Sequence, residues 1–544
     1  MAATRYRLLC AAAIALAVIA VPLIASNDSS ADPPTIIDSG ITGDVEWSLD
    51  SDGLLSITGN GEMADYSSGF ANPWYTYGLT DIFSINVGEG VTHVGNFAFQ
   101  YCQVAATATL PDGLISIGDR SFEQCQKLLT INLPESLTSI GKAAFNGCIK
   151  LESAIVIPDG ITSLPDTVFN GCASIKSITL PEGLTTIGFN TFGNCKSLQS
   201  ITLPEGLTSI GGSAFSGCSA LQSITLPEGL TSIEANTFSF CATLTSLNIP
   251  DGVTSIGSGA FASCFKLESL NIPDGVTSIG VSAFEYCESL KKISIPEGVT
   301  AIDSYTFSNC ISLQSITLPE GLTVIGSYVF RNCISMTEIS IPEGVKNIQF
   351  ETLSGCVSLK KLSLSDNTLL SGTSFATCAN LDTLRITASG SPNSIISTYF
   401  PESHSSASTT PWQLSGMPMT RPIINLIIDT ENPIDLSDLA IIEGKTLTIT
   451  AQSINTSGGM YYDTDGVAEL LGEDIAGKKY IATDIEGTLS WVAVDEPMQE
   501  QEQTGLWYKG SVEIFAGYSL PVWAVIVLII CCFAALSVIW KIAT

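Results

Sequence analysis

The spacing of the cysteines is the feature that most restricts how this chain can fold. Thirteen of the 16 cysteines follow one another at intervals of 23 residues, apart from one interval of 24 and one of 22. They are residues 102, 125, 148, 172, 195, 218, 241, 264, 287, 310, 333, 356 and 378. Three positions before each stands an apolar residue, which is leucine at position 353 and phenylalanine at the other twelve. Agreement over so many units identifies a tandem repeat, the sequence signature of a solenoid.

Each repeat predicts two short extended segments joined by a turn. In residues 198–203, apolar and polar side chains alternate with the period of a half-buried strand. Pro204-Glu205-Gly206 predicts a turn, because proline fixes φ and glycine accepts positive φ. Residues 207–210 begin a second extended piece. Residues 214–218 are too few for a stable α-helix and favour a helical or 3-10 turn.

A single repeat cannot bury its own Leu, Ile, Phe and Cys side chains, whereas stacked repeats share one continuous core. At about 4.8 Å between strands, thirteen coils extend on the order of 60 Å. The predicted fold is therefore a right-handed, β-rich leucine-rich-repeat solenoid of about 13 repeats of 23 residues. We expect a small C-terminal β-rich region and a C-terminal transmembrane helix to follow it.

The repeated string Ile-Thr-Leu-Pro-Glu-Gly-Leu-Thr-Ser-Ile-Gly-x-x-x-Phe-x-x-Cys resembles the BspA-like branch of the leucine-rich repeats. Residues 45–63 resemble the lead-in that such proteins often carry, and Pro73-Trp74 follows, so the resemblance covers roughly residues 40–386. It implies a secreted or surface protein with a binding or adhesive role and no catalysis. It transfers no ligand, because the repeats determine the fold and binding depends on variable exposed positions.

The two ends of the chain predict export and anchoring. Arg5 and Arg7 precede an apolar stretch and a small-residue site, which indicates a signal peptide over residues 1–31 or, as the alternative, an uncleaved anchor. Residues 520–540 carry no charge and are long enough to span a bilayer, although a buried helix is the competing interpretation. Lys541 favours a cytoplasmic C-terminus. We expect a single-pass cell-surface protein with an extracellular ectodomain.

Shifts in composition divide the chain into successive segments. We predict a signal peptide (1–31), a β-rich N-terminal cap (32–79), leucine-rich repeats (80–386), a cap or loop (387–421), a small β-rich module (422–494), an acidic stalk (495–516) and a transmembrane anchor (517–544).

Composition excludes several classes of function. The 22 Lys and Arg residues against 53 Asp and Glu residues leave a net charge of −31, which repels nucleic acid. The two histidines, His93 and His404, are 311 residues apart, and neither stands in a nucleophile or metal-binding motif. We therefore expect no catalysis and no bound cofactor.

The thirteen periodic cysteines favour a ladder of buried thiols over disulfides. All of them occupy the same slot, so neighbours point the same way, and parallel Cβ vectors disfavour disulfide geometry. No C-x₂-C pair occurs in the repeats to suggest zinc. We predict that these thiols pack as small apolar groups beside the phenylalanines.

The turn of every repeat carries an acidic residue, which we call the acidic column. Its members are Glu89, Asp112, Glu135, Asp159, Glu182, Glu205, Glu228, Asp251, Asp274, Glu297, Glu320, Glu343 and Asp366. The simplest interpretation is thirteen solvated turn residues. The alternative is that Ca²⁺ binds along the column, because hard oxygen ligands suit this ion.

Small hydroxyl residues fill most outward positions of the first extended segment, which predicts a flat polar face. Charged residues interrupt this face in the C-terminal half, where specificity for a partner is easiest to encode. The candidate partner-binding residues are Lys291, Lys292, Glu338, Lys360 and Lys361. We expect an extracellular protein or glycan as the partner. The competing hypotheses are a structural envelope or matrix protein that associates with itself, and ice binding by the threonines that recur in the second extended segment, at positions 185, 208, 231, 254, 277, 300 and 323.

Overall fold

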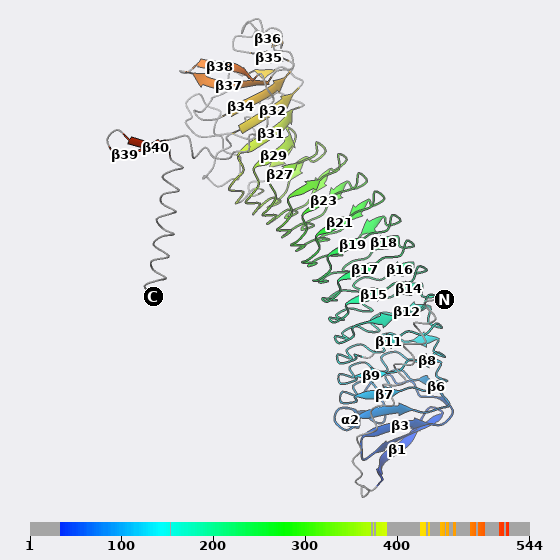
Figure 1. The fold of residues 1–544 in the computed structure, drawn as a ribbon. Helices are drawn as coiled ribbons and strands as arrows, with labels where there is room; N and C mark the ends of the chain where they lie inside the picture. The colour runs from blue at the N-terminus through cyan, green and yellow to red at the C-terminus, as the bar shows by residue number, and fades with distance from the viewer. Residues whose placement is uncertain are drawn as a thin grey trace, which may run out of the picture.

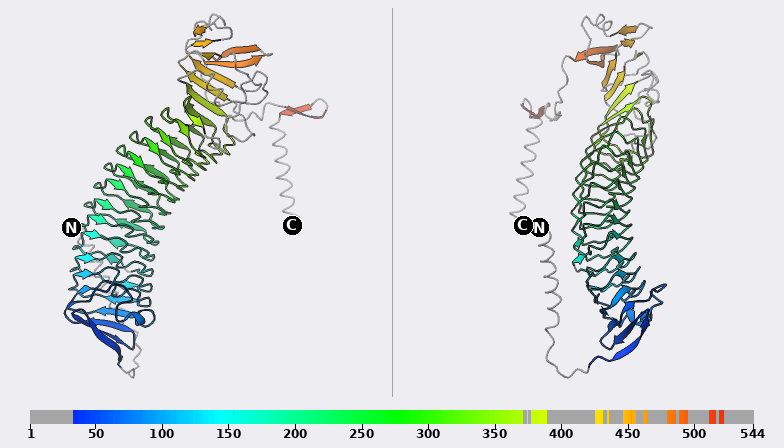
Figure 2. Two further views of the ribbon diagram at one scale, coloured as in Figure 1. Left: turned by 180° about the vertical axis from the view of Figure 1, so that it is seen from behind. Right: turned by 90° about the vertical axis from the view of Figure 1, so that its right-hand side faces the viewer.

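The computed structural model describes residues 33–152, 154–370, 374 and 377–388, together with the backbone of strands between 425 and 521. These residues form a long, curved rod of stacked coils (Figure 1). Figure 2 shows the rod from behind and from the side, with an N-terminal cap at one end and the strands of residues 479–494 across the other. The single helix among the described residues is α2 (Tyr75–Gly78).

The N-terminal cap joins an antiparallel sheet to the first parallel coil. Strands β1 (Ile36–Thr42), β2 (Val45–Asp50) and β3 (Leu54–Thr58) pair antiparallel, and β3 then pairs parallel with β5 (Ser84–Val87). Trp74 is fully buried beneath this sheet, and its indole Nε1 donates a hydrogen bond to the Ala98 carbonyl oxygen at 2.8 Å. The cap therefore closes the end of the core with an aromatic ring.

Two parallel strand columns run along the rod, with one short strand of each in every coil. The first strand column continues from β5 through β7 (Thr107–Thr109), β9 (Thr130–Ile131), β11 (Ile155–Val156), β13 (Ile178–Thr179), β15 (Ser200–Thr202), β17 (Ser223–Thr225), β19 (Ser246–Asn248), β21 (Ser269–Asn271), β23 (Lys292–Ser294), β25 (Ser315–Thr317), β27 (Glu338–Ser340), β29 (Lys361–Ser365) and β31 (Thr383–Ala388). Its paired strands are parallel and in register, as Ser200 opposite Ser223 shows.

The second strand column contains the even-numbered strands of the repeats. They are β4 (Gly61–Glu62), β6 (Val91–Val94), β8 (Ser116–Ile117), β10 (Ser139–Ile140), β12 (Ser163–Leu164), β14 (Thr186–Ile187), β16 (Ser209–Ile210), β18 (Ser232–Ile233), β20 (Ser255–Ile256), β22 (Ser278–Ile279), β24 (Ala301–Ile302), β26 (Val324–Ile325), β28 (Asn347–Ile348) and β30 (Leu369–Leu370). The predicted solenoid of about 13 coils of 23 residues is thus confirmed.

Phenylalanine rings stack through the centre of the rod. From Phe99 to Phe330, successive ring centroids lie 5.1 to 6.0 Å apart, and Trp74 stacks on Phe99 at 5.7 Å. All of these rings are fully buried, and Leu353 occupies the same slot in a later coil. Phe375 lies outside the described residues. Because every ring contacts the next, burial in one coil depends on the presence of its neighbours.

The periodic cysteines line the core beside this stack as buried free thiols, as predicted. In twelve of them, Sγ donates to the carbonyl oxygen of the Phe or Leu in the preceding coil, at 3.0 to 3.3 Å. Burial raises the pKa of the Cys218 thiol to about 12. The slot therefore favours a small apolar side chain that can also donate one hydrogen bond.

The helical or 3-10 turn expected before each cysteine is wrong, because the segment forms turns with two left-handed residues. In one coil these are Ser213 at φ 57° and Gly217 at φ 74°, and the same two positions have positive φ in neighbouring coils. Phe215 donates its N–H to the Thr237 carbonyl of the next coil, whereas Cys218 donates to Phe215 within the turn. Alternate N–H groups thus bond between coils, which prevents a continuous helical ladder.

The sheet of the first strand column continues beyond the repeats. Strands β32 (Asn425–Thr430) and β34 (Thr446–Ala451) add to β31 in parallel register, and β37 (Lys479–Ile485) and β38 (Thr488–Val494) follow antiparallel. Smaller pairings involve β33 (Ile434–Asp435), β35 (Ser453–Asn455), β36 (Tyr461–Asp463), β39 (Ser511–Phe515) and β40 (Tyr518–Pro521). Strands therefore occupy parts of the predicted module (422–494), the stalk (495–516) and the start of the anchor (517–544).

Within the described part of the chain, no helix has the length and apolarity needed to cross a bilayer. The predicted signal peptide (1–31) and residues 522–544 of the predicted anchor lie outside the described residues, as do Cys10, Cys531, Cys532 and His404.

We predict that replacing one Phe of the stack by alanine destabilises the rod far more than replacing it by leucine. Phe215→Ala removes a fully buried ring and leaves a cavity, which costs about 3–5 kcal/mol of unfolding free energy. Phe215→Leu, the matched control, places in this slot the residue found at position 353 and costs about 1 kcal/mol. Chemical denaturation followed by circular dichroism measures both values, and equal losses would contradict the role of the ring stack.

We also predict that the core thiols are protected in the folded chain. The test protein carries C10S, C531S and C532S, so that only the thirteen periodic thiols remain. Because these thiols are buried and the thiolate is the reactive form, Ellman's reagent at mildly alkaline pH should modify none of them quickly. All thirteen should react after denaturation. Rapid reaction of several native thiols, or missing equivalents after denaturation, would contradict a ladder of free buried cysteines.

Candidate functional site

The structure places all five candidate partner-binding residues along the first strand column, in two groups. Lys292, Glu338 and Lys361 each begin a strand, and Lys291 and Lys360 directly precede two of these strands. All five side chains are exposed. We call the outward side of the first strand column the strand face. The two lysine pairs lie on it three coils apart, which is about 14 Å at the usual strand spacing.

In-register pairing determines which of these charges are neighbours. Lys361 pairs with Glu338 of the preceding coil, whereas Lys292 pairs with Ser315. Lys291 forms an ion pair with Glu268 at 2.9 Å, and both side chains are more than half exposed. The strand face therefore carries mixed charge with two cationic points, and solvent keeps each pair weak.

Most other positions of the strand face carry small polar residues, although Lys176 and Glu268 occupy the slot of Lys291 in earlier coils. In β15 and β17 the first and third residues are exposed hydroxyl residues, while the central Ile201 and Ile224 are buried in the core. The same exposed–buried–exposed pattern recurs in β19, β21 and β23. The lysines and Glu338 are thus departures from a repeated background of Ser, Thr and Asn.

The acidic column lies at the turns, and its carboxylates are spread along the rod. Twelve of its thirteen members are exposed and Asp366 is half-buried. Two neighbouring members are in contact where the Glu320 N–H donates to Glu297 Oε2 at 3.3 Å. Among the described residues, no group of three or more His, Cys, Asp or Glu side chains is arranged to hold a metal ion. Calcium binding along the column therefore stays a prediction.

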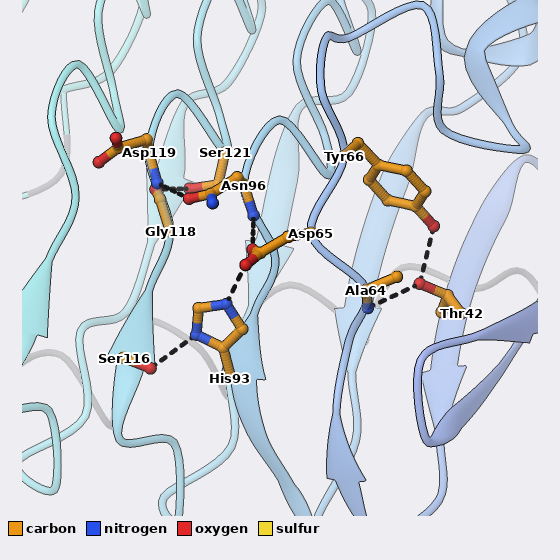
Figure 3. Close-up of polar contacts among 10 residues, drawn as sticks. All are labelled: Thr42, Ala64, Asp65, Tyr66, His93, Asn96, Ser116, Gly118, Asp119 and Ser121. Atoms are coloured by element: carbon orange, nitrogen blue, oxygen red, sulfur yellow. Dashed lines mark hydrogen bonds and ion pairs between the residues drawn. The ribbon is translucent and has the colours of Figure 1, made fainter.

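The structure also reveals a polar network at the N-terminal end that we did not predict (Figure 3). His93 Nδ1 lies 2.6 Å from Ser116 Oγ, and His93 Nε2 lies 3.3 Å from Asp65 Oδ1. His93 and Ser116 are 23 residues apart and pair between β6 and β8. Writing the repeats in register would have placed the histidine beside this serine, but no repeat pattern includes Asp65.

These three residues have the connectivity of a catalytic triad but lack the donors that acyl transfer requires. The backbone N–H groups of Ile115, Gly118 and Asp119 already donate to Thr92, Val94 and Asn96. Ser116 and Ile117 lie in the parallel ladder with β6. No pair of free N–H groups among these neighbours can therefore stabilise an oxyanion at Ser116. The network instead ties the cap to the first two coils.

Asp65 begins a short ladder of side-chain acceptors on this surface. Its Oδ1 accepts the Asn96 N–H at 2.7 Å, and Asn96 Oδ1 accepts the Asp119 N–H at 2.6 Å. Asp119 Oδ1 then accepts the N–H of Lys142 at 2.7 Å. The Asn96 N–H, followed by the hydrogen bond and charge of His93, lowers the pKa of Asp65 despite an opposing effect of partial burial. The ionised carboxylate therefore stabilises the folded cap.

We predict that Asp65→Asn flattens the acid side of the stability profile. The unfolded carboxyl takes up a proton near pH ~4, above the lowered folded pKa of Asp65, so wild-type stability should fall as the pH drops from ~5 toward ~3. The variant lacks this increment and should lose less stability over the same interval. Thermal unfolding at a series of pH values measures both curves, and parallel curves would contradict the assignment.

Comparisons with known proteins agree with this architecture. The model of the BspA type leucine rich repeat region matches the chain in 6 copies, over residues 74–176, 162–291 and 277–405. A solved leucine-rich repeat protein from Bacteroides ovatus is 27% identical, and the match covers 66% of this chain and 94% of that one with a TM-score of 0.54. A leucine rich cell surface protein from Faecalibacterium prausnitzii is 26% identical over 68% of this chain and 98% of that one, with a TM-score of 0.39. No curated protein matches the chain.

The family match covers more than half of the 544 residues, in the same segment that forms the stacked coils. Solenoids of this type are typical of surface and binding proteins, because their stacked coils form an extended exposed surface to which a ligand can bind. The chain belongs to the BspA type leucine-rich repeat family.

Proposed function

We propose that this protein is a non-catalytic binding or adhesion protein of the cell surface. In this proposal the N-terminal segment directs export, the C-terminal apolar segment holds the chain in the membrane, and the rod extends outward. Its strand face binds an extracellular protein or glycan.

The observation that carries the proposal is the clustering of charged residues on a strand face that consists mostly of small polar residues. Lys291 and Lys292 stand at one coil and Lys360 and Lys361 three coils on, with Glu338 between them. The Phe stack and the thiol slot constrain the interior of every coil, but they do not constrain these exposed positions. Because the two lysine pairs lie at a defined separation, they favour a partner that carries two anionic groups at the same separation.

The small side chains between the lysine pairs suit a partner that lies flat along the rod. Ser315 and Thr317 of β25 are exposed, and the neighbouring Ile316 packs against the core. Hydroxyl groups can donate to and accept from polar groups of either a protein or a sugar. The charges would then set specificity and association rate more than total affinity.

The test compares paired lysine variants of the full chain. K291S/K292S and K360S/K361S each remove one cationic point, while K142S/K346S removes two exposed lysines outside the strand face and serves as the matched control. Binding is measured on arrays of extracellular matrix proteins and of neutral and acidic glycans. We expect each strand-face variant to lose roughly tenfold in affinity and the control to bind normally.

Equal behaviour of the three variants on every bound array member would contradict the proposal. Sedimentation of the full chain at micromolar concentration separates the proposal from the structural alternative. A chain that assembles with itself and binds no array member would be a matrix or envelope protein instead.

A further inference from the structure

The antiparallel sheet of the cap ends in an open strand edge. Strand β1 is the terminal strand of its sheet, and among the described residues it pairs with β2 alone. The Ser39 N–H is accepted by the Asp38 carboxylate at 2.8 Å, in an exposed hydrogen bond, and not by a neighbouring strand. Main-chain groups at such an edge can pair with an additional strand.

This edge exposes several large apolar side chains. Ile36, Ile37 and Ile41 are 60%, 54% and 75% exposed, whereas most isoleucines in the coils are buried. Natural edges are commonly blunted by lysine, proline, a bulge or an inward charge, and β1 has a bulge between Ile36 and Asp38, yet its isoleucines stay exposed beside these features. A hollow of about 460 Å³ lies beside the strand, with Ile41, Glu46, Trp47 and Thr58 in its lining.

The cap around this edge is strongly anionic. Residues 33–119 include eleven Asp and Glu residues and no Lys or Arg. Asp38 lies within β1 itself, and Glu46 pairs directly with Ile41 across the β1–β2 ladder. Two copies of the cap would repel each other at this edge, whereas a cationic segment would be attracted.

We propose that β1 binds an extended segment of another protein that alternates apolar and basic residues. The segment adds a strand to the open edge of the cap sheet, so main-chain hydrogen bonds supply affinity. Its apolar side chains lie on the face of Ile37 and Ile41, and its basic side chains lie on the opposite face, which carries Asp38. This edge belongs to the same sheet as the first strand column, but it lies at the N-terminal end of the rod, away from the lysine pairs.

The test uses three fluorescein-labelled heptapeptides that alternate valine with a second residue. The first carries lysine at the alternate positions, the second carries glutamate, and the third is the lysine peptide with its central residue changed to proline. Fluorescence anisotropy with the full chain should show saturable, salt-sensitive binding of the lysine peptide and roughly tenfold weaker binding of the other two. The proline peptide serves as the backbone control, because proline removes the N–H that an added strand donates.

Variants of β1 locate the binding site. Ile41→Lys places a cation on the edge and should lower the affinity for the lysine peptide roughly tenfold. Ile41→Val preserves the apolar edge and should bind the peptide normally. Ser39→Pro removes an N–H that β2 does not use, so the cap should stay folded by circular dichroism while peptide binding falls. K291S/K292S should bind the peptide normally, so peptide binding at β1 is tested independently of partner binding at the lysine pairs.

Three results would overturn the proposal. The first is equal binding of the lysine and proline peptides, which would indicate charge attraction without strand addition. The second is unchanged binding by Ile41→Lys. The third is concentration-dependent self-association that Ile41→Lys abolishes, because a second copy would then occupy the edge.

Discussion

The contact between one coil and the next is the interaction on which the whole structure depends. Each Phe ring covers the ring below it, and each cysteine thiol donates to the carbonyl of the Phe or Leu in the preceding coil. Neither interaction exists within a single repeat. The rod therefore gains its stability from repetition, and its ends need special protection. At the N-terminal end, Trp74 and the antiparallel strands of the cap provide it.

The same constraint separates positions that maintain the fold from positions that are free to bind. Inward residues such as Ile201 and Phe215 are buried in nearly all equivalent coils that the structure describes, and the turn residues are restricted by left-handed backbone geometry. In the odd-numbered strands from β15 to β27, the first and third residues are exposed to solvent. Chemical variety at those positions costs the fold little, so a binding function can be encoded there.

Different parts of the structure were predictable to different degrees, for physical reasons. The alternation in residues 198–203 identifies the strands, and the 23-residue spacing of Phe and Cys identifies the core. Both were predictable because the same positions are buried in each repeat. The turn before Cys218 was mispredicted, because its N–H groups bond partly to another coil and local sequence does not report such partners. The network of Asp65, His93 and Ser116 was missed because Asp65 lies outside the repeat register.

The sequence by itself determined the period, the number of coils, the inward Phe and Cys residues and the acidic turn of each coil, because each is a local pattern copied many times. The tertiary structure alone decided the contacts that lie outside the repeat register. It brought Asp65 beside His93, closed the cap around Trp74 and left β1, among the described residues, paired on one side only. These features arise where two coils meet or where the stack ends, and such contacts have no counterpart in the pattern of one repeat.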